Sequence, residues 1–296
     1  MSICHRCSGS RVIFSVRNQL VQAGICQCIG KNCKLCSDQK IITTRDEKGR
    51  FFSKKCECVG LRQKIDLLNR IQIPGIYFDA EFTNFSKTDR LPKLKTAIDK
   101  SIKFIDSIEN WEESNFSSDR KGLLFYGTAG TGKTRLMCVL LKELVMRQMI
   151  PCQFVEFTSL INDIKTGYDK GESENNLIAP LIEIEILGID ELGKGRRSDW
   201  WIGILDNIIT RRYNAGKLTF FTTNYSIQKK IGYSEKFVAA NKYSSSVDDD
   251  YSTQTLNERL NDRIYSRLCE MCFFIDMNFE DFRNRISHQE KEVEIL

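Results

Sequence analysis

One octapeptide constrains the fold of this chain more than any other feature: Gly127-Thr-Ala-Gly-Thr-Gly-Lys-Thr134. An apolar run, Leu123–Tyr126, precedes it, and the residues after it have apolar side chains at helical spacing. This order predicts a phosphate-binding loop, because glycines let backbone N–H groups point inward and a helix N-terminus attracts anions. We expect Lys133 to reach the β- and γ-phosphates of a nucleotide and Thr134 to hold Mg²⁺. The residues predicted to line the nucleotide are Gly127, Thr128, Ala129, Gly130, Thr131, Gly132, Lys133, Thr134 and Arg135.

A second motif supplies the acidic partner that such a loop needs. The largely apolar run Ile184–Ile189 ends in Asp190 and Glu191. A buried strand that ends in this pair predicts that Asp190 binds Mg²⁺, mostly through water, and that Glu191 is the general base for the attacking water. A further apolar run, Lys217–Thr223, leads to Asn224, which we expect to orient the same water.

Other candidate strands alternate with helix-like stretches along the chain. Gln153–Phe157 lies between the two motifs, and Phe273–Met277 comes near the end. Strands that alternate with helices predict an α/β fold with a parallel sheet between two helical layers. Because only residues 278–296 follow the last strand, we expect little or no helical lid, so that a neighbouring subunit must help to enclose the nucleotide.

Eight of the twelve cysteines lie in the first 58 residues, where one frame occurs twice. Lys and Arg gather in the same region: residues 1–60 carry eleven of them against four Asp and Glu, and residues 61–296 carry 33 against 35. The composition divides the chain into a basic, cysteine-rich head (1–60) and a near-neutral body (61–296). The first copy of the frame contains Cys4, Cys7, Cys26 and Cys28, and the second contains Cys33, Cys36, Cys56 and Cys58.

The repeated frame predicts two zinc sites with four cysteines each. Two thiolates of a Cys-x2-Cys pair can bind one ion, and a second pair completes a tetrahedron at about 2.3 Å per Zn–S bond. Pairing between the copies would use the same ligands and is the alternative. Strand patterns at Arg11–Val16 and on both sides of Asp46–Arg50 predict that each copy is a hairpin. Eight thiolates and two Zn²⁺ would reduce the formal charge of the head from +7 to +3, which favours a protein partner over nucleic acid.

The sequence argues against two classes of protein. No apolar run approaches the roughly 18–20 residues of a membrane-spanning helix. The first residues lack the apolar core of a secretory signal. We therefore expect a cytoplasmic protein with no membrane partner, in a reducing compartment where clustered cysteines bind metal rather than form disulfides.

Together these motifs resemble the DnaC/IstB branch of the AAA+ ATPases. The branch contains bacterial replicative helicase loaders and transposition helper ATPases. The resemblance spans roughly residues 68–287 and begins at Leu68–Phe85. It is carried by GTAGTGKT, ILGIDELG, the helix that ends at Ile208–Tyr213, FFTTN and LNERLNDRIYSRLCEM.

The resemblance implies roles for three arginines. The family's arginine finger, which reaches the nucleotide of a neighbouring subunit, corresponds to Arg267, with Arg263 as the alternative one turn earlier. From spacing alone, the same two residues could form a salt-bridged helix face. Arg283 corresponds to the family's C-terminal arginine that senses phosphate within its own subunit. Related loaders contact single-stranded DNA near residues 166–176, although the lysines here are too few to predict that contact from charge.

The resemblance also implies a function. We expect an ATPase that uses Mg²⁺, contains two Zn²⁺ and self-associates through its ATPase domain. It would bind a replicative helicase through residues 1–60 and help place it on single-stranded DNA when DNA replication begins. One alternative is a transposition helper that binds DNA and recruits a transposase. Another is an adaptor that binds ATP with little turnover, but an adaptor has no use for a general base such as Glu191.

Overall fold

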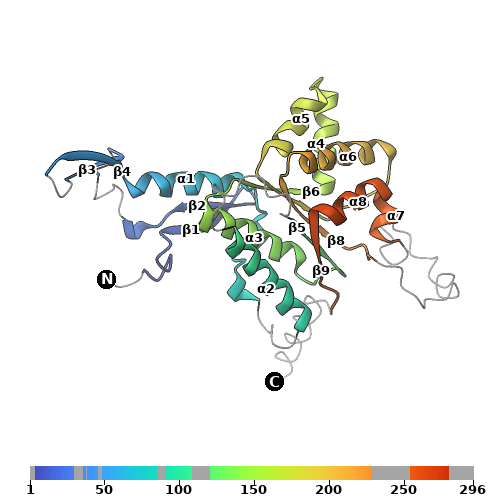
Figure 1. Ribbon diagram of the computed structural model, residues 1–296, viewed down its shortest axis with the longest axis horizontal. Coiled ribbons are helices and arrows are strands. Elements are labelled where there is room, and N and C mark those ends of the chain that lie inside the picture. Colours follow the sequence, from blue (N-terminus) through green and yellow to red (C-terminus); the bar gives the residue numbers. More distant parts are fainter. Residues whose placement is uncertain are drawn as a thin grey trace.

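The computed structural model describes residues 4–29, 36–37, 39–45, 49–85, 91–108, 121–227 and 254–279 (Figure 1). Within these ranges, five strands form one sheet in the order β6-β7-β8-β5-β9, and all neighbouring strands are parallel. This confirms the predicted parallel sheet. The strands are β5 (Gly122–Tyr126), β6 (Cys152–Glu156), β7 (Ile186–Asp190), β8 (Leu218–Thr223) and β9 (Cys272–Asp276).

Helices cover both faces of the sheet, which confirms the three-layer α/β class. Along β5, Leu123 and Phe125 pack into one core while Leu124 packs into the core on the opposite face. A strand that is buried on both faces has a continuous apolar sequence, as this one does. One face is covered by α1 (Glu57–Arg70), α2 (Pro92–Ser107) and α3 (Lys133–Gln148). The other is covered by α4 (Phe157–Asp169), α5 (Glu174–Glu183), α6 (Asp199–Asn214), α7 (Leu256–Leu260) and α8 (Asp262–Met271).

The cysteine-rich head forms two antiparallel hairpins, as predicted. The backbone N–H of Cys26 donates to the carbonyl of Arg11 at 2.9 Å, and that of Cys56 donates to the carbonyl of Lys40 at 2.8 Å. Arg11 and Lys40 also share a φ of 65°. The repeated sequence frame is therefore a repeated structure. The strands are β1 (Val12–Arg17), β2 (Leu20–Ile25), β3 (Ile41–Arg45) and β4 (Phe51–Lys55).

The two copies end differently. In the first copy, Cys26 is followed by a single 3-10 turn, η1 (Gln27–Ile29). In the second copy, Cys56 is the N-cap of the fourteen-residue helix α1. Because α1 continues across residue 60 to Arg70, the head passes into the body without a break in helical structure.

The β1–β2 hairpin packs against the body. Val12 and Val21 lie in the same hydrophobic core as α1, α2 and α3. The side chain of Asn69 on α1 accepts the backbone N–H of Ala23 at 2.7 Å and donates to its carbonyl at 3.3 Å. These two bonds fix β2 against α1.

The segment after α1 joins this hairpin to the edge of the large sheet. The N–H of Val21 in β2 donates to the carbonyl of Ile73 at 2.8 Å. The N–H of Phe154 in edge strand β6 donates to the carbonyl of Ile71 at 2.7 Å. Residues 71–73 thus contact β2 on one side and β6 on the other, so the first hairpin is part of the folded body.

The β3–β4 hairpin lies at the N-terminal end of α1, whereas the first hairpin contacts the C-terminal end of that helix. It is far from the large sheet (Figure 1). Every residue of β4 is exposed.

No helix in the part of the chain that the structure describes has the length and apolar character of a membrane span.

Candidate functional site

The predicted phosphate loop connects β5 to α3. A Cβ atom at Gly127, which has a φ of 149°, would lie 2.6 Å from the carbonyl carbon of Met277. The backbone therefore requires glycine there. Lys133, the first residue of α3, is buried and donates its Nζ to the carbonyls of Gly127 and Thr128 at 2.8 and 2.6 Å. The loop thus holds the ammonium group within its own turn, where a bound phosphate would meet it.

The structure brings the two predicted Mg²⁺ residues into contact. The hydroxyl of Thr134 donates to Oδ1 of Asp190 at 2.8 Å, and the hydroxyl of Thr222 donates to the same oxygen at 2.5 Å. Burial raises the pKa of Asp190 to about 6, although these hydrogen bonds lower it in part. A hydroxyl beside a carboxylate is the oxygen donor set that Mg²⁺ prefers. The residues present therefore fit the ion.

Glu191 follows β7 in a left-handed conformation, with a φ of 54°. Its backbone N–H donates to Oγ1 of Thr222 at 2.9 Å, which fixes this turn. Its carboxylate forms an ion pair with Lys194, three residues later in the chain. Sequence reasoning missed Lys194, although i,i+3 spacing after the acidic pair was a signal for it. The predicted general base is thus held by a cation of its own loop.

Asn224 and Arg135 have different surroundings. Asn224 directly follows β8, a strand paired with both β5 and β7. It therefore lies at the same carboxyl edge of the sheet as the phosphate loop and Asp190. The guanidinium of Arg135 forms an ion pair with Asp79 at 3.1 Å, and this contact lowers the pKa of Asp79.

The predicted finger arginines lie on α8. Both pair with Asp206 of α6, Arg263 at 3.5 Å and Arg267 at 3.3 Å. The structure therefore places both on one face of the helix and holds them within the subunit. Arg283, the predicted phosphate sensor, lies outside the described residues.

Arg212 is a buried arginine that sequence reasoning did not single out. It has no exposed surface. It donates to the carbonyls of Leu181, Ile184 and Leu218 at 2.6, 2.8 and 2.5 Å. Its Nε also donates to the hydroxyl of Thr219 at 2.9 Å. Burial lowers the pKa of Arg212 to about 9. One side chain thus joins the end of α5 to the start of β8.

Arg259 is a second arginine of this kind, in α7. It donates to the carbonyls of Gly193, at 2.7 Å, and Gly195. Its guanidinium also lies 5.7 Å from the ring of Trp201 and 5.5 Å from that of Tyr225. Arg259 therefore ties α7 to the loop that carries Glu191 and Lys194.

Seven of the eight predicted zinc ligands are described, and they group within the copies. One cluster contains Cys4, Cys7, Cys26 and Cys28, and the other contains Cys36, Cys56 and Cys58. Cys33 lies outside the described residues. Sulfur atoms are 3.8 Å apart for Cys4 and Cys26, 3.7 Å for Cys7 and Cys28, and 3.5 Å for Cys36 and Cys58. A tetrahedron with Zn–S bonds of about 2.3 Å has sulfurs about 3.8 Å apart, so these residues fit zinc.

Electrostatics in the first cluster also fit a cation. Backbone N–H groups of Arg6 and Cys7 lower the pKa of Cys4 to about 7. The neighbouring sulfur of Cys26 is the main cause that raises the pKa of Cys28 to about 12. Four adjacent thiols cannot all ionise unless a cation offsets their charge. The cluster could therefore hold a metal ion, with no position left over for substrate if all four sulfurs bind.

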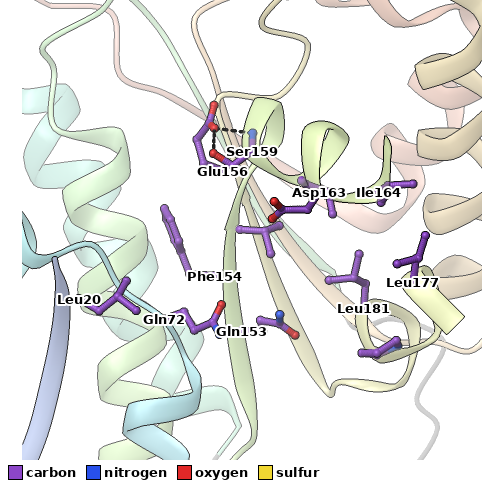
Figure 2. A pocket seen from close by; sticks show the side chains of 13 residues that line it. Leu20, Gln72, Gln153, Phe154, Glu156, Ser159, Asp163, Ile164, Leu177 and Leu181 are labelled. Carbon is purple, nitrogen blue, oxygen red and sulfur yellow. Dashed lines mark hydrogen bonds between the residues drawn. The ribbon is translucent and has the colours of Figure 1, made fainter. Parts of the chain in front are cut away.

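A pocket of about 470 Å³ lies between the first hairpin, edge strand β6, and helices α4 and α5 (Figure 2). Leu20 and Gln72 line one side, and Leu177 and Leu181 line the other. Glu156 at its wall accepts the N–H and hydroxyl of Ser159 at 2.8 and 2.7 Å, as the N-cap of α4. No residue of the two nucleotide motifs, all of which are described, lines this pocket. It is separate from the phosphate site.

Comparison with known proteins agrees with these features. The family model described as IstB-like ATP binding protein matches residues 84–239, more than half of the chain. The replicative helicase loader DnaC of Escherichia coli (strain K12) is 22% identical over 255 residues, which cover 85% of this chain and 89% of that protein. The uncharacterized protein YqaM of Bacillus subtilis (strain 168) is 21% identical over 207 residues. That match covers 68% of this chain and 63% of YqaM, less than two thirds of its length.

A solved structure is similar as well. The crystal structure of the DnaC helicase loader superposes with a TM-score of 0.50 at 29% sequence identity. The match covers 68% of this chain and 97% of that one.

Proposed function

Because this chain belongs to the family of IstB-like ATP-binding proteins, we propose that it is a Mg²⁺-dependent ATPase that loads a replicative helicase onto single-stranded DNA. The observation that carries this proposal is the similarity to the crystal structure of the DnaC helicase loader, over 97% of that chain. Similarity to the E. coli replicative helicase loader DnaC over 85% of the present chain supports the same function.

In this proposal the hydrolytic site lies at the carboxyl edge of the sheet. Lys133 contacts the β- and γ-phosphates of ATP, and Asn224 orients the attacking water. Glu191 accepts the proton of that water, for which it must leave Lys194. Mg²⁺, held by Thr134 and, through water, by Asp190, would neutralise charge on the phosphates. The contact between Thr134 and Asp190 supports this assignment.

Self-association completes the site. A finger from a neighbouring subunit, Arg267 or in its place Arg263, would stabilise charge on the γ-phosphate. Both side chains pair with Asp206 of their own subunit, so either one must leave this carboxylate to reach a neighbour's nucleotide. Hydrolysis would then depend on protein concentration.

The head is the proposed helicase-binding part, with one Zn²⁺ in each cysteine cluster. Closed four-thiolate sites supply folding free energy rather than chemistry. The continuous helix α1 and the hydrogen bonds from β2 to Ile73 and from β6 to Ile71 support transmission of a partner's position to the edge of the ATPase sheet.

Helicase loading tests this function. Full-length chain, replicative helicase and ATP are mixed with circular single-stranded DNA that is coated with single-strand-binding protein, and unwinding of an annealed strand is measured. Wild-type chain should restore unwinding, whereas Lys133→Ala chain should not. Failure of the wild-type chain to bind the helicase in a pull-down, with capture of a transposase instead, would show a transposition helper.

A further inference from the structure

The two hairpins of the head share a frame but differ in burial. In the first, Val12, Val21 and Ala23 are buried in the body core. In the second, Phe51 and Phe52 are 67% and 48% exposed, and Ile41 is 53% exposed. Residues 39–45 and 49–55 of this second hairpin are called the ribbon below. Its apolar side chains gain little from packing within the chain.

The charge of the ribbon is one-sided. The described residues of the ribbon contain five Lys and Arg and no Asp or Glu: Lys40, Arg45, Arg50, Lys54 and Lys55. The equivalent strands of the first hairpin, residues 12–25, contain one basic residue, Arg17. Over residues 38–55 as a whole, the sequence has six basic and three acidic residues. The basic residues are thus a property of this copy and not of the zinc-binding frame.

The strand register places an aromatic ring and a cation on each face. Arg45 lies opposite Phe51, and Ile41 lies opposite Lys55. On the other face, Phe52 lies opposite Thr44, and the next pair on that face joins Lys54 to Ile42. The guanidinium of Arg45 is 4.2 Å from the centroid of the Phe51 ring. This contact orients the ring while most of its surface stays accessible.

The ribbon is held at its base by the second cysteine cluster. An isolated two-stranded hairpin is marginally stable in water. The Cys36 and Cys58 sulfurs, 3.5 Å apart, close this one where β3 and β4 meet α1. The cluster's sulfurs therefore lie at the base, next to Lys55, whereas the exposed rings of Phe51 and Phe52 lie towards the turn.

We propose that the ribbon binds single-stranded nucleic acid. Bases stack on Phe51 and Phe52, and Lys54 and Lys55 contact the phosphates. Aromatic rings combined with lysine and arginine are the general means of binding single strands. Protein interfaces, in contrast, are depleted in lysine, of which the ribbon has three. This inference goes beyond the proposed function, since it requires neither ATP nor the helicase.

The test measures the affinity of the full-length, zinc-loaded chain for a labelled oligothymidylate without ATP. Loss of both rings in Phe51→Ala/Phe52→Ala should weaken binding by at least about tenfold, because each base stack contributes on that order. Lys54→Glu/Lys55→Glu should also weaken binding and lower the slope of log affinity against log salt by about 1.4, since each phosphate contact on a single strand contributes about 0.7.

Two matched variants serve as controls. Phe273→Ala removes an exposed aromatic ring from β9, and Lys95→Glu/Lys103→Glu reverses two exposed charges on α2. Both should bind oligothymidylate as the wild type does. Zinc content and the unfolding temperature of each variant are measured alongside. If the double alanine variant loses zinc, the double glutamate variant decides the outcome.

Three results would overturn the proposal. The first is wild-type affinity and salt slope for the oligonucleotide in the ribbon variants. They could instead lose only helicase binding, which would make the ribbon a protein-docking surface. Tighter binding of duplex than of single strand, lost in the same variants, would refute stacking on unpaired bases. Because the helicase-loading assay is separate, failure here leaves the ATPase proposal standing, and the reverse is also true.

Discussion

Arg263 and Arg267 contact the same carboxylate, that of Asp206, although α8 and α6 are about sixty residues apart in the chain. The Arg267 side chain is 22% exposed and that of Arg263 is 64% exposed. Partly exposed ion pairs contribute only about 0–1 kcal/mol. A neighbouring subunit's nucleotide, with its higher charge, could therefore compete with Asp206 for either arginine.

Arg267→Ala should abolish most ATP hydrolysis but leave ATP binding intact. A finger supplied by a neighbour accelerates phosphoryl transfer by about 10³–10⁵ in other nucleotidases. Steady-state hydrolysis and binding of a fluorescent ATP analogue measure the two effects. Mixing inactive Arg267→Ala chain with inactive Glu191→Gln chain should restore part of the activity, because some interfaces then combine an intact base with an intact finger. If Arg267→Ala hydrolyses ATP at the wild-type rate, then either Arg263 is the finger or neither arginine is.

Asp206→Asn is the matched control for that variant. It removes the carboxylate but leaves both guanidinium groups. If Asp206 only holds the arginines in the free subunit, hydrolysis should persist and its dependence on protein concentration should weaken. A loss as large as that of Arg267→Ala would instead mean that Asp206 positions the finger.

Lys133→Ala and Glu191→Gln should fail at different steps. Lys133 would contact phosphate directly, so its loss should weaken ATP binding itself. Glu191→Gln keeps the side chain's size but removes the base, so it should bind ATP and hydrolyse it at least about 10²-fold more slowly. Calorimetric titration with ATP and a phosphate-release assay separate the two. Equal loss of binding in both would mean that Glu191 supports the loop rather than the reaction.

Much of the nucleotide site was predictable from sequence because each part is local. Glycines with positive φ precede Lys133, and apolar runs end in Asp190 and Asn224. Parallel strands bring such ends to one edge of a sheet. The pairing of Glu191 with Lys194 was less visible, because many surface acids have a lysine three residues away.

Contacts between distant segments could not be read from the pattern. Arg212 lies in a helix among polar neighbours and looks like a surface residue, yet the carbonyls that accept its hydrogen bonds belong to two other elements. The unequal burial of the hairpins was also hidden, since the cysteine frame is the same in both. It depends on which hairpin meets Asn69 and the apolar face of α1.

Arg212→Met should strongly destabilise the chain. Methionine fills similar space but leaves several buried carbonyls without a donor, which should cost about 3–5 kcal/mol. That corresponds to a decrease in Tm on the order of 10 °C for a domain of this size. Its neighbour Arg211 is exposed, and its guanidinium donates to the side chain of Asn175 at 3.1 Å. Arg211→Met is therefore the matched control and should leave Tm nearly unchanged.

Asp190 should make stability depend on pH when Mg²⁺ is chelated. Burial raises its folded-state pKa to about 6 from an ordinary 3.8, so the folded chain binds the proton more tightly than the unfolded chain. The free energy of unfolding should therefore fall as pH rises through about 6, by up to about 3 kcal/mol. Asn can still accept the Thr134 and Thr222 hydroxyls. Asp190→Asn should then be more stable than wild type at neutral pH, with the difference shrinking towards pH 3.8. Thermal unfolding of both proteins in EDTA at several pH values measures this difference in stability. A difference that is the same at all pH values would contradict a raised pKa of Asp190.

Cys28→Ser and Cys58→Ser should have unequal effects, although the residues are equivalent in the repeat. Each change should remove a ligand from one cluster and lower the zinc content by about one ion per chain, at a local cost on the order of 10 kcal/mol of metal-binding free energy. Cys28 closes the first hairpin. That hairpin places Val12 and Val21 in the body core, and its Ala23 is hydrogen-bonded to Asn69. Cys58 closes the exposed ribbon.

Cys28→Ser should therefore lower the Tm of the whole chain and its ATPase activity, because a loosened first hairpin exposes one side of the core shared with α1. Cys58→Ser should free the ribbon and weaken oligonucleotide binding while the ATPase and the main unfolding transition stay close to wild type. Zinc analysis, thermal unfolding and ATPase assays on the two variants, side by side, make the comparison. An equal fall in Tm would mean that the second cluster is needed to hold the N-terminus of α1, and that the two hairpins stabilise the body alike.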